Sequence, residues 1–412
     1  MKLFRHIALC LGIALAGSSH AQVRIAQLDG VSGPFANVGD QQRKTLQAMF
    51  DEINARGGIN GQKLELVSID GKGSPQESLN AFKQAVDQGI RFITQGNSSA
   101  VAAALSDAVS KYNQRNPDSP ELYLNHSAID NDLTNAKCNF WHFRFDPNVE
   151  MKVQVIAQEL VRNPSVKNVY LINQNYALGQ QVSASAKHLL PLRRPDIKIV
   201  GDDLHPFGQV KDFSTYVAKV KAANADTILT GNWGNDLSLL VKAVKDANLN
   251  VSLYTIYGSG FGAPTAVREA GIDRLRVVSV WAPNIPQNKS EKFAADFKKK
   301  YGIELYFQQI RTMMQMFEAA ARQAKSNDPK AIALALEGMK FTADTGEAEM
   351  RKADHQIMLP MFTSTMKKTA ANGGPAEVKN DSEGTGVVGF QTNSKFEAFV
   401  SALPTTCQMK RP

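Results

Sequence analysis

The chain has 412 residues, of which 43% are hydrophobic, and it carries 47 basic against 39 acidic residues, a formal net charge of +8. The basic residues are scattered, and the densest run, Lys298 to Lys300, ends a predicted amphipathic helix, where positive charge complements the helix dipole. Because no basic stripe is interleaved with aromatic residues, the composition argues against a nucleic-acid partner.

The first 21 residues have the pattern of a secretory signal peptide. Lys2 and Arg5 precede an apolar run from Ile7 to Ala16, and small residues follow up to Ala21. This run is too short to span a bilayer, and no later stretch approaches the roughly 20 apolar residues of a membrane helix. Cys10 lies inside the run, away from the cleavage junction, so we expect no lipid anchor. We therefore expect cleavage after Ala21 and export of a soluble protein to the periplasm.

Two cysteines, Cys138 and Cys407, remain after the predicted cleavage. In an oxidising compartment an even pair usually forms a disulfide, which here would join the C-terminal tail to the middle of the chain. A pair of free buried thiols is the alternative. Residues 22–412 exceed what one hydrophobic core normally supports, so we expect two lobes.

The first part of the exported chain alternates between predicted strands and helices. The strands lie at 23–29, 63–69, 91–95 and 121–125, and the helices at 40–55, at 78–89 and from 100 onward. Such alternation is typical of an α/β fold with a parallel sheet.

One of these joints between a strand and a helix carries a candidate site. Arg91 to Gln95 form the predicted buried strand, Gly96 to Ser99 a tight polar turn, and a helix of small residues follows. The free amides of the helix N-terminus and the hydroxyls of Ser98 and Ser99 favour an anion, such as a carboxylate, beyond the strand end. The alternative is that either serine only caps its own helix.

The alternation restarts after a polar segment at 126–139 and an aromatic-rich stretch at 140–145. Predicted helices lie at 149–160, 180–190, 213–222 and 237–247, and strands at 166–173, 197–204, 227–231, 251–257 and 276–280. A helical region at 290–324, interrupted near Gly302, precedes a helix at 331–339 and short strands at 348–352 and 358–364. The segment 367–384 is low in hydrophobic residues, and we expect it to be mobile.

No arrangement of residues predicts an enzyme. The histidines outside the leader lie in unrelated segments without metal-ligand spacing, at positions 126, 142, 188, 205 and 355. His126 precedes a candidate ligand segment, so it could line the cleft; the alternative is an ordinary surface or packing histidine. The glycine-rich stretch Gly258 to Gly262 lacks the spacing of a nucleotide-binding loop, and we interpret it as a flexible turn. We therefore predict no catalytic residue, no metal and no cofactor.

Several stretches resemble one protein family. They are Val31–Pro34, Asp51–Leu64, which is the most specific, and Gly96–Ala100, with further support from Lys211–Phe213, Ala225–Asp226 and Arg351–Gln356. These residues resemble the periplasmic solute-binding proteins of branched-chain amino-acid-type ABC importers, and the similarity extends from Val23 to about Phe362. The resemblance implies the type I periplasmic-binding-protein fold, in which two Rossmann-like α/β lobes are joined by three crossing segments around a ligand cleft.

We place the crossings near Phe145, Trp281 and Ala348. The N-terminal lobe then comprises residues 22–145 plus 282–348, and the C-terminal lobe comprises residues 146–281 plus 349–412.

The resemblance also implies where the ligand binds. The residues that match the carboxylate-binding segments of the family are Ser98, Ser99, Ala100, Ser127, Ala128 and Ile129. The residues that match its second-lobe wall are Tyr176, Trp233 and Tyr257.

The chain departs from the amino-acid-binding pattern at the ammonium end. Ile129 replaces a hydroxyl residue that commonly helps to hold the ligand ammonium, and Tyr257 stands near the position of the acid that neutralises it. An ammonium buried without a charged partner costs several kcal/mol. Asp236 lies close enough in sequence to supply that acid, so both amino acids and aromatic or hydrophobic organic acids stay as candidates.

We therefore expect a monomeric, non-enzymatic receptor that captures a small carboxylate-bearing solute by lobe closure and passes it to an ABC permease in the inner membrane. The alternative is a periplasmic sensor that presents its bound state to a signalling partner. A third possibility, an exported hydrolase, lacks a catalytic group in the sequence.

Overall fold

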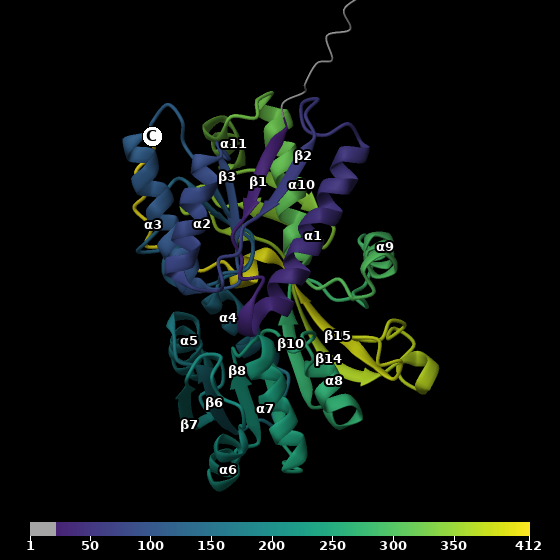
Figure 1. Cartoon of the computed structure of the whole chain (residues 1–412). Helices are drawn as coiled ribbons and strands as arrows, with labels where there is room; N and C mark the ends of the chain where they lie inside the picture. The colour runs from purple at the N-terminus through teal and green to yellow at the C-terminus, as the bar shows by residue number, and fades with distance from the viewer. Residues whose placement is uncertain (1–21) are drawn as a thin grey trace, which may run out of the picture.

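The computed structural model describes residues 22–412, so the predicted signal peptide lies outside the described residues. Figure 1 shows two α/β lobes, one above the other, with α9 to the side of them. Each lobe is built on one β-sheet, as the alternation of strands and helices predicted.

The first lobe, at the top of Figure 1, contains a five-stranded parallel sheet with the order β2-β1-β3-β4-β5. Its strands are β1 (Val23–Gln27), β2 (Leu64–Ser68), β3 (Phe92–Gln95), β4 (Leu122–Asn125) and β5 (His142–Arg144). Its helices are α1 (Ala36–Ala55), α2 (Pro75–Asp87), α3 (Ser99–Arg115), α10 (Gln308–Ala324) and α11 (Pro329–Leu336). β3 and β4 are buried at every residue, which explains why their sequences do not alternate between apolar and charged residues.

The second lobe contains a seven-stranded sheet with the order β15-β14-β10-β9-β8-β6-β7. Its strands are β6 (Asn168–Gln174), β7 (Lys198–His205), β8 (Thr227–Thr230), β9 (Ser252–Thr255), β10 (Leu275–Ser279), β14 (Met361–Lys368) and β15 (Val388–Phe396). Its helices are α4 (Val149–Val161), α5 (Ala177–Arg193), α6 (Ser214–Ala222), α7 (Gly234–Asp246) and α8 (Ala263–Val267). β6 to β10 pair in parallel, whereas β14 and β15 add an antiparallel edge.

A small antiparallel sheet and a surface helix complete the described fold. The sheet has the order β11-β12-β13, with β11 at Lys340–Ala343, β12 at Gly346–Met350 and β13 at Ile357–Met358, and the helix α9 spans Glu291–Tyr301. The strands of the second lobe come from 168–279 and from 361–396, so the chain leaves that lobe and returns to it. The residue at which each lobe begins stays a prediction.

The sequence prediction missed three strands, β5, β11 and β15. β15 has the sequence VGFQTNSKF, and its many polar residues gave no strand pattern in the sequence. In the structure it is an edge strand that pairs with β14 along its whole length. The segment 367–384, which we expected to be mobile, is instead held to the second lobe. Val378 is buried, and Asn284 exchanges two hydrogen bonds of 2.9 Å with the backbone of Asn380.

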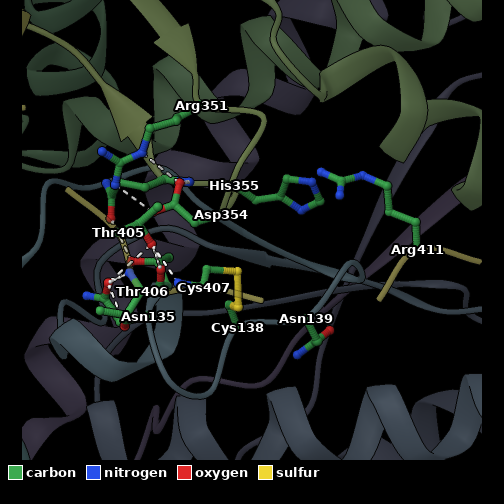
Figure 2. Close-up of a disulfide and its surroundings, with 12 residues drawn as sticks. Asn135, Cys138, Asn139, Arg351, Asp354, His355, Thr405, Thr406, Cys407 and Arg411 are labelled. Carbon is green, nitrogen blue, oxygen red and sulfur yellow. Dashed lines mark hydrogen bonds and ion pairs between the residues drawn. A yellow bond between two sulfur atoms is a disulfide. The ribbon is translucent and has the colours of Figure 1, made fainter. Parts of the chain in front are cut away.

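Cys138 and Cys407 form the predicted disulfide, shown in Figure 2, so the alternative of two free thiols is wrong. Neighbouring residues of the tail add hydrogen bonds: Thr405 donates to the carbonyl of Thr134 (3.0 Å), and the amide of Thr406 donates to Asn135 Oδ1 (3.0 Å). The tail follows β15 of the second lobe, and the disulfide together with these hydrogen bonds holds it to the segment before β5 of the first lobe.

Candidate functional site

A narrow cavity lies between the two lobes. The segments that line it follow β3, β4, β6, β8 and β9, so the cavity lies at the carboxyl ends of parallel strands, where α/β proteins usually bind ligands. From the first lobe it is lined by Val38, Gln42, Gly96, Asn97, Ser98, Ser99, Ser127, Ala128 and Phe307. From the second lobe it is lined by Tyr176, Leu178, Trp233, Tyr257 and Phe261.

The turn after β3 places two serines with different roles at the start of α3. Ser98 is the N-cap of the helix, and its Oγ accepts a hydrogen bond from the amide of Val101 (3.4 Å). Ser99 is 1% exposed, and its Oγ has no hydrogen-bond partner among the described residues. A buried hydroxyl without a partner is costly. Ser99 is therefore the serine that is free to bind a ligand, and it stands at the positive end of a 17-residue helix.

Gln42 on α1 is a second buried polar group without a partner. Its side chain is 0% exposed, it lines the cavity, and neither its amide nitrogen nor its amide oxygen forms a hydrogen bond within residues 22–412. The amide offers two N–H donors and one carbonyl acceptor. Ser99 and Gln42 together can therefore bind both a carboxylate and a neighbouring donor group of a ligand.

The segment after β4 is held rigidly against the turn after β3. Asn125 Oδ1 accepts hydrogen bonds from the amides of Ser127 (3.2 Å) and Ala128 (2.8 Å). The hydroxyl of Ser127 lies 3.0 Å from His126 Nδ1 and accepts a hydrogen bond from Gln309 Nε2 (3.0 Å). Ser127 is thus positioned by its neighbours before any ligand binds.

Asp29 anchors the turn from beneath. Its Oδ1 accepts hydrogen bonds from the amides of Gly96 (2.8 Å) and Asn97 (3.0 Å), and its Oδ2 lies 3.1 Å from both Gln27 Nε2 and His126 Nε2. Burial raises the pKa of Asp29, but the charge of His126 and these hydrogen bonds outweigh burial and hold the pKa below its ordinary value. Asp29 is therefore an ionised carboxylate in the interior.

The second lobe supplies an aromatic wall. The indole of Trp233 donates a hydrogen bond to the hydroxyl of Tyr176 (2.8 Å). Burial raises the pKa of Tyr176 and of Tyr257 above the ordinary value, and nearby carboxylates add to the effect, so both phenols stay neutral. Phe261 completes the wall from the glycine-rich loop before α8.

The lining of the cavity includes no charged side chain among the described residues. Asp236 does not supply one, because its Oδ2 accepts hydrogen bonds from Gln174 (2.8 Å) and from the amide of Gly208 (2.9 Å) away from the cavity. A neighbouring cavity behind Tyr257 contains Asp146, whose carboxylate lies 2.7 Å from the ammonium of buried Lys152. That carboxylate is already neutralised by its own partner.

The structure brings together seven of the nine ligand residues predicted from the sequence. The two exceptions are Ala100, which is exposed on α3, and Ile129, which is 0% exposed in the core. Whether the other seven bind a ligand stays a prediction. Sequence reasoning missed Gln42, Phe261 and Phe307, and the stretch that we interpreted as a flexible turn contributes Phe261.

Comparisons with known proteins place the chain in a family. The family model described as "Periplasmic binding protein" matches residues 22–373. Leu/Ile/Val-binding protein homolog 4 of Brucella melitensis is 34% identical over 98% of this chain and 97% of its own length.

Solved structures agree with this placement. The leucine-, isoleucine-, valine-, threonine- and alanine-binding protein of Brucella ovis, in its closed conformation, superposes with a TM-score of 0.84 at 32% identity, over 95% of this chain and 100% of that one. A solute-binding protein of an ABC transporter from Rhodopseudomonas palustris, in complex with 3,4-dihydroxybenzoic acid, shares the fold at 16% identity with a TM-score of 0.76, over 92% of this chain and 98% of that one. The chain therefore belongs to the type I periplasmic binding proteins of the branched-chain amino-acid family, whose members serve ABC transporters.

Proposed function

We propose that this protein captures a small carboxylate-bearing solute with an apolar body in the periplasm and delivers it to an ABC permease. The observation that carries the proposal is the asymmetry of the cavity. One side has the N-terminus of α3 and the unpartnered side chains of Ser99 and Gln42, and the other side is aromatic. A carboxylate fits the first side, and burial of an apolar group fits the second.

Two classes of solute satisfy this asymmetry. The relatives named for leucine, isoleucine and valine favour an aliphatic amino acid. The cavity lining favours an organic acid without an ammonium group, because among the described residues it provides no carboxylate, and its unpartnered side-chain acceptors are the neutral oxygens of Gln42 and Ser99. The two classes differ in one chemical group, so a matched pair of ligands separates them.

Closure of the lobes would complete the site. The ring of Phe35, just before α1, lies 4.6 Å from the ring of Phe207 and 4.2 Å from that of Trp233, both in the second lobe. Across the same boundary the amide of Asn131 donates to Gln181 Oε1 (2.6 Å). These contacts support a mechanism in which the solute stabilises the closed form, and the permease recognises that form.

The test is binding of paired probes by isothermal titration calorimetry and thermal shift. The pairs are L-leucine with 4-methylpentanoate and L-phenylalanine with 3-phenylpropanoate; each pair differs only in the amino group, and 4-methylpentanamide is the uncharged control. A bound probe at 100 times its dissociation constant adds about 2.7 kcal/mol to stability.

The proposal expects binding of one member of a pair and none of the amide. Preference for the deaminated acid assigns an organic acid, and preference for the amino acid assigns Gln42 to the ammonium end. Equal binding of the amide, or binding of none of the carboxylates, would contradict the proposal. Deletion of the neighbouring permease genes separates transport from a sensor role. If the protein serves a permease, the deletion abolishes uptake of the probe; if the protein is a sensor, uptake continues.

A further inference from the structure

A buried chain of polar groups lies directly behind the cavity. It runs from Asp29 to His126, then to Ser127 and to Gln309 of α10. Asp29 and His126 are both 0% exposed, and of the four residues only Ser127 lines the cavity. This chain of polar groups therefore links a buried ionisable pair to a hydroxyl at the ligand site.

The partners of His126 determine where its protons lie. Asp29 already accepts hydrogen bonds from the amides of Gly96 and Asn97 and from Gln27 Nε2, so it acts as an acceptor toward His126 as well. His126 Nε2, 3.1 Å from Oδ2, therefore carries a proton. His126 Nδ1, 3.0 Å from Ser127 Oγ, then has two possible states. In neutral imidazole it is an acceptor, and in imidazolium it is a donor.

These two states give the hydroxyl of Ser127 opposite roles. A serine hydroxyl has one proton to donate and two lone pairs, and Gln309 Nε2 occupies one lone pair at 3.0 Å. When His126 is neutral, the Ser127 proton is used in a hydrogen bond to Nδ1. When His126 is protonated, Nδ1–H occupies the second lone pair, and the Ser127 proton is left to point into the cavity.

We propose that His126 is a positioning residue whose protonation turns the hydroxyl of Ser127 toward the carboxylate of the solute, so that binding of an anionic solute takes up one proton. This inference rests on the proposed function of the cavity. The cavity would then prefer an anion although no charged side chain among the described residues lines it. The positive charge would be on His126, which does not line the cavity but contacts Ser127, which does.

The surroundings of His126 are compatible with a buried imidazolium. Its Nε2 faces Asp29. Asp146 is the other buried carboxylate that interacts with its charge, and burial keeps the pKa of Asp146 raised although Lys152, Arg144 and His126 lower it. The faces toward α10 and toward the turn after β3 are neutral, with Phe307 6.5 Å from the ring. Gly96 permits this packing, because a Cβ on it would lie 2.5 Å from His126 Nδ1.

The experiment measures the affinity of the wild-type protein for 4-methylpentanoate and L-leucine between pH 5.5 and 8.5, above the range in which the probe carboxyl titrates. We expect affinity to fall as the pH rises, with a slope that does not exceed about tenfold per pH unit for one linked proton, and calorimetry in buffers of different ionisation enthalpy to show proton uptake on binding. Nitrogen-15 spectra of labelled histidine should show Nε2–H imidazole at high pH without probe and a doubly protonated ring when the probe is bound.

Two variants separate positioning from structural support. His126→Gln keeps a polar side chain of similar length but cannot titrate, and we expect it to bind the probe with an affinity that no longer changes with pH. His188→Gln, at an exposed position on α5, is the matched control and should retain the wild-type pH profile. If His126→Gln does not fold, the wild-type nitrogen-15 spectra decide.

The outcomes are distinct. Binding of a probe with no pH dependence, or a spectrum of neutral Nδ1–H imidazole in the bound state, would overturn this inference and leave the proposed function intact. Failure of these two probes and of L-phenylalanine and 3-phenylpropanoate to bind at every pH would overturn the proposed function, and this inference with it.

Discussion

Ser98 and Ser99 adjoin in the chain but have different chemical roles, and a pair of variants separates them. Ser98 caps α3 through the amide of Val101, whereas Ser99 has a buried hydroxyl without a partner in the cavity. We expect Ser98→Ala to lower the free energy of unfolding by about 1 kcal/mol. We expect Ser99→Ala to weaken binding of a carboxylate probe by about ten- to a hundredfold with little change in stability, since a hydrogen bond to a charged group contributes about 1.5–3 kcal/mol.

Urea unfolding and calorimetry on both variants check this separation. Equal effects of the two substitutions on stability and on affinity would return Ser99 to a purely structural role.

We expect the buried amide of Gln42 to lower the stability of the free protein but to contribute to ligand binding. Replacement of a buried, unpartnered amide by an apolar group of similar size removes a desolvation cost, so Gln42→Leu should be as stable as wild type or more stable, by about 1 kcal/mol. The same variant should lose binding of the carboxylate probes. Gln41→Leu, on the same helix at a half-exposed position, is the control for the added apolar surface. Loss of stability in Gln42→Leu with unchanged affinity would argue that the amide is structural.

The sequence could have predicted Gln42 only through helical spacing. Val38, Leu46, Met49 and Ile53 form the buried stripe of α1, and Gln42 falls on that stripe, one turn from Val38. A polar residue on an apolar stripe indicates either a buried hydrogen bond or a ligand contact, and only the three-dimensional structure shows that Gln42 has no hydrogen-bond partner within residues 22–412. The serine turn was predictable because a strand, a polar turn and a helix follow one another in the sequence.

At the scale of elements, the short segment before α1 forms a contact between the lobes. Phe35 packs against Phe207 and Trp233 of the second lobe. Because each aromatic pair contributes about 0.5–1.5 kcal/mol beyond burial, Phe35→Ala should shift the protein toward an open form and weaken probe binding by about ten- to a hundredfold.

Small-angle scattering with and without probe, together with calorimetry, measures this effect. Phe399→Ala is the matched control, because Phe399 is 77% exposed. It does not line the cavity, and it does not belong to the aromatic pairs that Phe35 forms with Phe207 and Trp233. An unchanged radius of gyration and an unchanged affinity in Phe35→Ala would contradict a role of this contact in closure.

Helices and strands with a strong hydrophobic periodicity could be predicted from the sequence. Segments whose structure depends on pairing or hydrogen bonding with a distant segment could not. The alternation of buried strands and amphipathic helices indicated both sheets of the α/β fold. β15 was missed because its stability comes from pairing with β14 and not from its own apolar content. The same holds for the segment after β14, which is low in hydrophobic residues and is held by the burial of Val378 and by two hydrogen bonds between Asn284 and Asn380.

At the scale of the whole molecule, one buried acid predicts how stability depends on pH. Glu121, just before β4, is 2% exposed, and burial raises its pKa to about 8, partly opposed by Arg91, from an ordinary 4.5. Between these two pH values the unfolded chain ionises Glu121 more readily than the folded protein does. The free energy of unfolding is therefore highest below pH 4.5 and falls as the pH rises through about 8.

Glu121→Gln should therefore remove this loss and raise the free energy of unfolding at pH 8.5 by about 5 kcal/mol relative to wild type, with little difference at pH 4.5. Urea unfolding at the two pH values measures it, with Asp118→Asn at an exposed position as the control. A wild-type protein that is equally stable at both pH values would show that Glu121 ionises freely in the folded state.

The central claim is that the cavity between the lobes selects a carboxylate through Ser99 and Gln42. Native mass spectrometry tests it most directly, with the whole exported protein in an equimolar mixture of L-leucine, 4-methylpentanoate, 3-phenylpropanoate and the amides of the two acids. We expect the wild-type protein to form one-to-one complexes with a carboxylate and none with an amide. We expect these complexes to be lost in a Ser99→Ala, Gln42→Leu double variant that remains folded. Complexes with the amides at equal abundance, or carboxylate complexes that persist in the folded double variant, would contradict it.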